Sequence, residues 1–188
     1  QIITSSLATV HYLKKRFPEG GPVYVVGESG LVETLANEGF YLAEDHALAV
    51  IAGLDRQLTY EKIKRATLLI RKGALFVGTN PDRTFPTPAG LVPGGGAVIA
   101  SIEAACDVKP IFIGKPFPAM MNMALEVMNT TPETSMVVGD RLDTDILAGQ
   151  NVKCKTALVL SGVTTQEELE KWVPQPDLVL PRADFLLE

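Results

Sequence analysis

The sequence predicts an α/β protein whose parallel or mixed sheet is covered by helices. Short apolar runs typical of strands alternate with segments in which apolar residues recur at helical spacing. This strand–helix–strand order is characteristic of sheets flanked by helices. The composition agrees, because 46% hydrophobic and 21% charged residues are ordinary for a globular protein. The 188 residues suffice for one sizeable domain or two small ones.

The expected elements follow one another regularly along the chain. A polar N-cap cluster opens a helix from Thr4 to Phe17. Beyond it we expect strands at 22–27, 49–53 and 74–78, with helices at 30–38 and 60–71 between them. A loop rich in Pro, Thr and Gly spans 80–96, and a helix then runs to about 106. The pattern resumes with strands at I-F-I (111–113), M-V-V (136–138), A-L-V-L (157–160) and D-L-V-L (177–180), and with helices beginning near 118, 143 and 165.

The most informative segment is V-V-G-D-R-L-D-T-D-I-L-A-G, residues 137–149. Its strand-like start and helix-like continuation place Asp140 at the carboxyl edge of a parallel sheet, where open α/β folds bind ligands. Carboxylates at such an edge suit a hard cation such as Mg²⁺. The competing interpretation is that Asp140 and Asp143 only cap the helix.

Two features favour a metal site over simple capping. Asp140 and Asp145 form a G-D-x-x-x-x-D frame, and Lys115 follows the preceding strand-like run I-F-I-G. A cation on one strand end beside carboxylates on the next describes a site for an anionic substrate bridged to a metal.

These motifs resemble those of a known family. The segments G-K-P and V-V-G-D-R-L-D-T-D-I look like motifs three and four of the haloacid dehalogenase-like (HAD) phosphatases. The T-D-I ending of the last segment, together with T-N-P-D (79–82) and P-G-G-G-A (93–97), narrows the resemblance to the subfamily with an α/β cap inserted after the second motif. That subfamily includes NagD-like, p-nitrophenyl-, phosphoglycolate and pyridoxal phosphatases. The resemblance covers essentially the whole chain and is carried by T-S-S-L-A-T (4–9), T-N-P-D (79–82), P-G-G-G-A (93–97), G-K-P (114–116), V-V-G-D-R-L-D-T-D-I (137–146) and V-L-S-G-V-T (159–164).

The resemblance implies a Rossmann-like core with an inserted cap, of which this chain holds a part. We expect a core helix at 1–20, the α/β cap at 21–107 and the C-terminal part of the core at 108–188. The family's D-x-D-G nucleophile segment and its second motif, a Ser or Thr at a strand end, are not found in the sequence. We therefore expect the chain to be inactive alone.

For the intact protein, the resemblance implies Mg²⁺-dependent hydrolysis of small phosphate monoesters through an aspartyl-phosphate. Asp140 would bind Mg²⁺, Asp145 would hold metal-bound water or orient the site, and Lys115 would neutralise phosphate and nucleophile charge. Asp143 would be a helix-start carboxylate. The loop 79–96 would present specificity residues of the cap, with Asn80, Asp82 and Phe85 as substrate-binding candidates; the alternative is that its prolines only stiffen a connection.

Other function classes are less well supported. A net charge of −5 argues against a nucleic-acid surface, and no apolar run is long enough for a membrane span. Cys106 and Cys154 show no metal or disulfide spacing, which fits a reducing cytoplasm. We set aside V-V-G-E-S-G (25–30) as an incomplete dinucleotide fingerprint and the two histidines, His11 and His46, as isolated.

Three possibilities stay open for the chain itself. It is an inactive portion of a phosphatase, a non-catalytic module that binds anions or another protein, or one half of a protein whose other half is supplied separately. A half core would leave strand edges and apolar helix faces uncovered, which predicts association and makes a homodimer possible.

Overall fold

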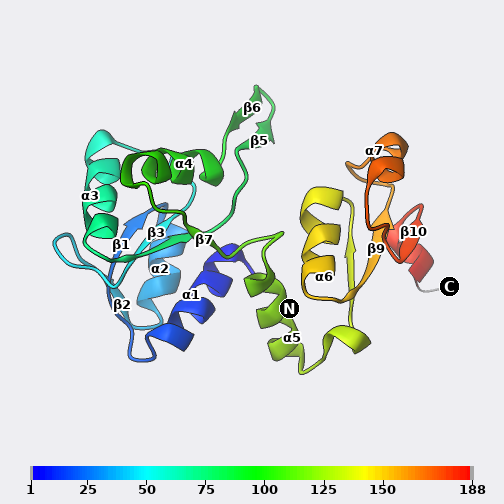
Figure 1. Ribbon diagram of the computed structural model, residues 1–188, viewed down its shortest axis with the longest axis horizontal. Helices are drawn as coiled ribbons and strands as arrows, with labels where there is room; N and C mark the ends of the chain where they lie inside the picture. The colour runs from blue at the N-terminus through cyan, green and yellow to red at the C-terminus, as the bar shows by residue number, and fades with distance from the viewer. Residues whose placement is uncertain (1, 187–188) are drawn as a thin grey trace. The chain divides into compact units, whose positions relative to one another are not determined.

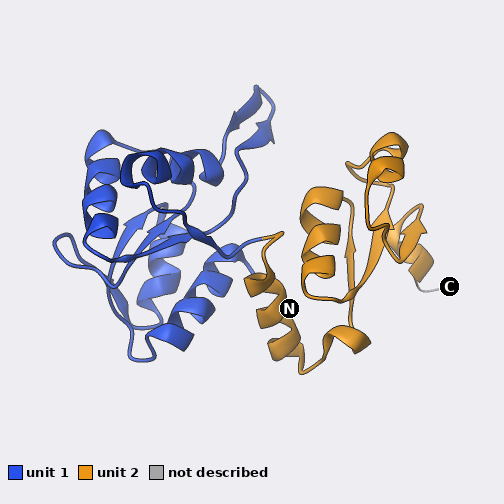
Figure 2. Cartoon of the chain, in the orientation of Figure 1, with its two compact units in different colours: residues 1–114 blue, residues 115–188 orange. Residues whose placement is uncertain are grey.

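The chain folds into two compact units, each with its own parallel sheet. In the computed structural model, described over residues 2–186, unit 1 extends to Gly114 and unit 2 begins at Lys115 (Figure 2). Both units are of the α/β class that the sequence predicts.

Unit 1 is built on a five-stranded parallel sheet in the order β2-β1-β3-β4-β7. The central strand β3 reads A-V-I-A and is buried at every position, as expected of a strand covered on both faces. The strand β2 is absent from the prediction because three residues carry too little periodicity. The bounds of the strands are β1 (Gly21–Val26), β2 (Phe40–Leu42), β3 (Ala49–Ala52), β4 (Leu75–Gly78) and β7 (Ile111–Phe112).

Helices cover both faces of this sheet (Figure 1). They are α1 (Ser5–Arg16) and α2 (Ser29–Ala36) on one face, and α3 (Tyr60–Arg71) and α4 (Gly95–Cys106) on the other. Thr4 and Thr59 cap α1 and α3 by accepting backbone N–H groups three residues on, which fixes where these helices begin. Ile99 and Ile102 of α4 are fully buried and pack with β3, β4 and α3 into the main core.

The segment expected to be a loop at 80–96 contains an antiparallel hairpin that projects from unit 1 (Figure 1). Its strands are β5 (Thr84–Thr87) and β6 (Gly90–Pro93). The Thr87 hydroxyl donates to the Gly90 carbonyl oxygen at 2.8 Å, and Gly90 has φ +115°, which closes the turn. Two prolines are tolerated because a two-stranded ribbon has outward-facing edges that need no N–H donors.

The strand before Lys115 joins a different sheet from the one that its motif predicts. β7 pairs with β4 of unit 1, and the N–H groups of Ile113 and Gly114 continue this pairing by donating to Gly78 and Thr79. Ile113, directly after β7, is fully buried. The units therefore divide at 114/115, while α1, expected to belong to the core, packs against α2 within unit 1.

Unit 2 has a three-stranded parallel sheet in the order β10-β9-β8. Within the described residues β8 pairs only with β9, and its Met136 and Val138 are 42% and 40% exposed. The elements of unit 2 are α5 (Pro118–Met128), β8 (Met136–Gly139), α6 (Leu147–Asn151), β9 (Lys155–Val159), α7 (Gln166–Lys171) and β10 (Leu178–Leu180), with a π-helical turn at Leu142–Ile146 and short 3-10 turns at Pro132–Thr134 and Ala183–Leu186.

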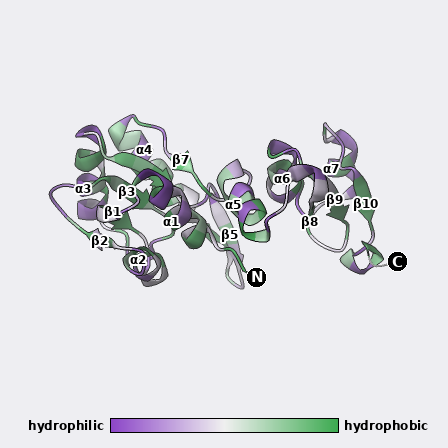
Figure 3. Cartoon of the chain, turned by 90° about the horizontal axis from the view of Figure 1, so that it is seen from below, coloured by the Kyte–Doolittle hydropathy of each residue, from purple (hydrophilic) through white to green (hydrophobic). Residues whose placement is uncertain are grey.

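Hydrophobic residues line the inner strands of unit 1, and among its helices α3 carries many hydrophilic residues (Figure 3). Between residues 2 and 186, no helix has both the length and the apolar character needed to cross a bilayer.

Candidate functional site

Asp140 lies directly after β8, at the carboxyl edge of the unit 2 sheet. Its carboxylate oxygen Oδ2 accepts a hydrogen bond from the Val163 N–H at 3.0 Å, and its carbonyl oxygen accepts one from the Thr164 N–H at 3.1 Å. The loop after β9 is therefore bonded to the loop after β8, because parallel neighbours end at the same edge. This arrangement fixes the Asp140 side chain at the sheet edge.

Gly162 makes this close approach possible. A Cβ atom at this position would lie 2.0 Å from Asp140 Oδ2. Any larger residue would displace either the carboxylate or the loop, so the observed position of Asp140 requires a glycine at 162.

Lys115 and Asp145 meet although 30 residues separate them. The Lys115 ammonium nitrogen lies 2.7 Å from Asp145 Oδ1, and Asp145 Oδ2 accepts the Arg141 N–H at 3.2 Å. The Asp145 side chain is only 13% exposed, so this ion pair is partly shielded from water. Gly139 allows the carboxylate to sit here, because a Cβ on Gly139 would lie 2.2 Å from Asp145 Cβ.

A π-helical turn sets the position of Asp145. The N–H groups of Asp145 and Ile146 both donate to the Arg141 carbonyl oxygen, at 3.0 and 3.1 Å. The wider turn is anchored by Leu142 and Ile146, which are 6% and 0% exposed. Single π turns occur frequently at functional sites. The sequence predicted an ordinary helix start, since no residue pattern marks this widening.

Asp143 pairs with the Arg141 side chain, whereas Asp145 pairs with Lys115. Its carboxylate accepts two hydrogen bonds from the Arg141 guanidinium, at 3.2 and 2.9 Å. Asp143 lies in the first turn of the π helix and is 64% exposed, an arrangement suited to a helix-start carboxylate.

The two carboxylates beside β8 have the donor chemistry for Mg²⁺. This ion commonly uses one or two carboxylates and completes its shell with water and substrate phosphate. Both Asp145 oxygens already accept hydrogen bonds, whereas Asp140 Oδ2 accepts one from a neutral N–H, so Asp140 is the better direct ligand. In the described part of the chain, no group of three or more His, Cys, Asp or Glu side chains is gathered as a metal site.

The cap candidates Asn80 and Asp82 form a small cluster at the end of β4 in unit 1. The Asn80 amide donates to Asp82 Oδ2 at 2.6 Å, and its carbonyl oxygen accepts from the Thr79 hydroxyl at 3.2 Å. The glycine run after β6 packs onto this turn, because a Cβ on Gly96 would lie 2.1 Å from the Pro81 carbonyl oxygen. The glycines thus allow a close approach between two stretches of backbone.

Phe85 lies apart from that cluster, on the hairpin. It is half-buried on β5 and is paired in register with Val92 of β6. Asn80, Asp82 and Phe85 belong to unit 1, whereas Lys115, Asp140 and Asp145 belong to unit 2. The structure thus pairs Asn80 with Asp82 and Lys115 with Asp145, while Phe85 lies on the separate hairpin.

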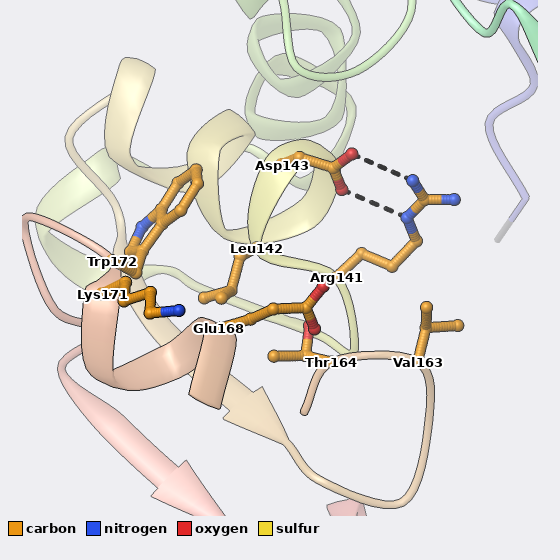
Figure 4. Close-up of a pocket in the computed structure, with 8 residues that line it drawn as sticks. All are labelled: Arg141, Leu142, Asp143, Val163, Thr164, Glu168, Lys171 and Trp172. Carbon is orange, nitrogen blue, oxygen red and sulfur yellow. Dashed lines mark hydrogen bonds and ion pairs between the residues drawn. The ribbon is translucent and has the colours of Figure 1, made fainter. Parts of the chain in front are cut away.

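A pocket of about 350 Å³ lies beside the aspartates in unit 2 (Figure 4). Trp172 and Lys171 lie on one side of it and Val163 on the other, with Leu142 between them (Figure 4). The sequence does not predict this pocket, because its lining comes from three separate segments. The lining residues are Arg141, Leu142, Asp143, Val163, Thr164, Glu168, Lys171 and Trp172.

Comparison with known proteins identifies similar sequences. A family model described as HAD-hydrolase-like matches residues 112–184. A protein named acid sugar phosphatase from Staphylococcus saprophyticus is 44% identical over 172 residues, which are 91% of this chain and 66% of that protein. Proteins of the same name from Staphylococcus aureus strains are 43% identical over 171 residues. The chain spans 66% of the length of these curated relatives.

Two solved structures are also similar to this chain. A single mutant of a thermostable NPPase from Geobacillus stearothermophilus superimposes with a TM-score of 0.91 at 42% identity, over 98% of this chain and 72% of that one. NagD from E. coli K-12 superimposes with a TM-score of 0.88 at 36% identity, over 95% of this chain and 70% of that one.

Proposed function

The chain belongs to the HAD-like hydrolase family, in the group that contains NagD and the p-nitrophenylphosphatases, and we propose that the protein is a Mg²⁺-dependent phosphatase of small phosphate monoesters. The observation that carries the proposal is the contact of Lys115 with Asp145, at 2.7 Å, beside Asp140 at the end of β8. A cation next to carboxylates at a strand end suits a phosphate that is bound together with a metal ion.

Each of these side chains has a distinct proposed role. Asp140 would hold Mg²⁺, which supplies positive charge that lowers the repulsion between the phosphate and an attacking carboxylate. Asp145 positions the Lys115 ammonium group through their ion pair and, from its place beside Asp140, would bind metal-bound water. Lys115 would neutralise the phosphate, most strongly when charge is concentrated at the moment of transfer.

The nucleophile is the part of the machinery that these 188 residues do not supply. In the resembled family it is the aspartate of a D-x-D-G segment, which becomes phosphorylated and is then hydrolysed; the sequence has no such segment. We therefore propose that the chain by itself does not turn over substrate. The edge of β8 that stays unpaired within residues 2–186, with its exposed Met136 and Val138, supports a further strand beside β8 in the working enzyme.

Substrate choice is proposed to depend on unit 1, acting as the cap. The hydrogen-bonded pair Asn80 and Asp82 offers fixed polar groups at a strand end, and Phe85 on the projecting hairpin offers an aromatic face. Because the curated relatives are named acid sugar phosphatases, sugar phosphates are the first substrate class to test.

The homodimer that the sequence makes possible stays a prediction. The two free, buried cysteines support a reducing, cytoplasmic location.

The test is hydrolysis of p-nitrophenyl phosphate and of sugar phosphates by the complete protein, with Mg²⁺ and with chelator. We expect turnover only with Mg²⁺, and a loss of about 10²-fold or more for Lys115→Met and Asp140→Asn. Lys64→Met is the matched control, because Lys64 also pairs with a carboxylate, at 3.1 Å, but lies on α3 of unit 1.

Three other outcomes would count against parts of this proposal. Metal-dependent turnover by the 188-residue chain alone would show that the nucleophile is within it. Unchanged activity of Lys115→Met would remove the proposed role of the ion pair. Absence of turnover by the complete protein would favour a module that binds anions or another protein.

A further inference from the structure

The pocket that adjoins Asp143 has the size of a small-molecule site. Its volume of about 350 Å³ falls in the range of about 300–1,000 Å³ typical of ligand pockets. It is formed by the π turn, the loop after β9 and the helix α7. Lys115, Asp140 and Asp145 do not line it, but Val163 and Thr164 also donate to Asp140, so the pocket adjoins the proposed phosphate site without including its side chains.

The base of the pocket is apolar and well supported. Leu142 is 6% exposed and belongs to a buried cluster against which the half-buried Trp172 packs. Val163 on the opposite side is 65% exposed (Figure 4). An indole ring with one side packed on a core offers its remaining surface for stacking with another ring, at centroid separations of about 4.5–7 Å.

The charged residues around this base already have partners. The Arg141 guanidinium is held by Asp143 through two hydrogen bonds, and Lys171 pairs with Glu167 at 2.6 Å. Glu168 accepts both the backbone N–H and the hydroxyl of Thr165, at 2.8 and 2.9 Å. The Thr165 hydrogen bonds also lower the pKa of Glu168 and keep it ionised.

The formal charges of the four charged lining residues sum to zero. Arg141 and Lys171 balance Asp143 and Glu168, so the pocket has no net charge to attract an anion. A charged ligand would have to displace one of the existing hydrogen bonds or ion pairs, whereas an uncharged ring would leave all of them intact. We propose that this pocket binds a neutral aromatic molecule, whose ring stacks on Trp172 and lies over Leu142.

Trp172 is the only tryptophan of the chain and reports directly on occupancy. The probe is p-nitrobenzyl alcohol, a neutral nitroaromatic that quenches indole fluorescence on contact, and p-nitrobenzoate is its anionic counterpart. We expect saturable quenching by the alcohol and binding of the benzoate that is weaker by at least about tenfold. Non-saturating quenching, or equal binding of the anion, would overturn the proposal.

Two matched variants locate the binding. Val163→Arg places a long side chain over the pocket, and we expect it to weaken binding of the alcohol by at least about tenfold. Val173→Arg is the control, because Val173 is 85% exposed, adjoins Trp172 and does not line the pocket. Circular dichroism checks that both variants are folded. Equal affinity of the two variants would refute the assigned site. This test needs no phosphatase activity, so its failure is separable from failure of the proposed function.

Discussion

Gly162→Ala tests whether the fixed position of Asp140 matters. The new Cβ would lie 2.0 Å from Oδ2, 2.3 Å from Cβ and 2.4 Å from Cγ of Asp140. Non-bonded carbon and oxygen atoms pack at about 3.5 Å, so the carboxylate or the loop must move by more than about 1 Å. Gly162 is not among the glycines with positive φ, so the conflict is with Asp140 and not with the backbone conformation.

The displacement has two measurable consequences. Movement of either partner strains or breaks the hydrogen bond from Val163 to Asp140, and overpacking of this kind costs about 1–3 kcal/mol of unfolding free energy. Urea unfolding followed by Trp172 fluorescence measures this in unit 2. In the complete protein, misplacement of a group by about 1 Å lowers kcat/KM by about 10²-fold.

Gly30→Ala is the matched control. A Cβ on Gly30 meets no atom within 4 Å, and the residue lies in the first turn of α2. We expect this variant to keep full activity and to be as stable as the parent or more stable by up to about 1 kcal/mol. If Gly162→Ala behaves as Gly30→Ala does in both measurements, the reasoning about Asp140 is refuted.

Two further predictions concern stability. Hydrogen bonds from the Lys155 side chain and from the Thr156 N–H lower the pKa of Asp177 in the folded protein. The ionised carboxylate therefore stabilises the fold at pH values above the pKa that Asp177 has in the unfolded chain. This contribution is lost as the pH falls through the pKa of the folded state. Asp177→Asn should therefore lower the unfolding free energy at pH ~7 and make little difference at low pH; a constant difference across a pH series of urea titrations would contradict this. Ile99→Ala should cost about 2–5 kcal/mol in urea unfolding followed by circular dichroism, because the side chain is fully buried. The exposed control Val173→Ala should change stability by less than about 0.5 kcal/mol, and equal effects of the two would contradict the assigned core.

Local signals in the sequence were sufficient for most helices and strands. Helices α1 and α3 lie where N-cap threonines and apolar spacing place them, at Ser5–Arg16 and Tyr60–Arg71. The fully apolar run of β3 marks a central strand. The hairpin at 84–93 was missed because its prolines and glycines are typical of loops, and its pairing depends on two short strands finding each other.

Long-range pairing explains the main difference from the predicted domain boundary. A two-residue strand carries almost no pattern of its own, so the sheet that β7 joins is decided by the available edge of β4. The Lys115 ammonium group nevertheless pairs with the Asp145 carboxylate. β7 thus belongs to the sheet of β4, and the ion pair forms regardless, because a side-chain contact at the end of a strand does not require both strands to share one sheet.

The glycines show most clearly what a linear motif leaves out. In G-D-x-x-x-x-D, Gly139 and Asp145 are separate letters, yet the structure places their Cβ positions 2.2 Å apart, so the aspartate is held only because its neighbour has no side chain. Gly162 stands in the same relation to Asp140 but lies outside that motif, on another loop. In the proposed metal site a carboxylate needs a fixed position as well as a charge. Each of the two aspartates occupies space that a side chain on a neighbouring glycine would fill. The two contacts together involve the loops after both β8 and β9, and a substitution at Gly162 should therefore displace Asp140 although the aspartate itself is unchanged.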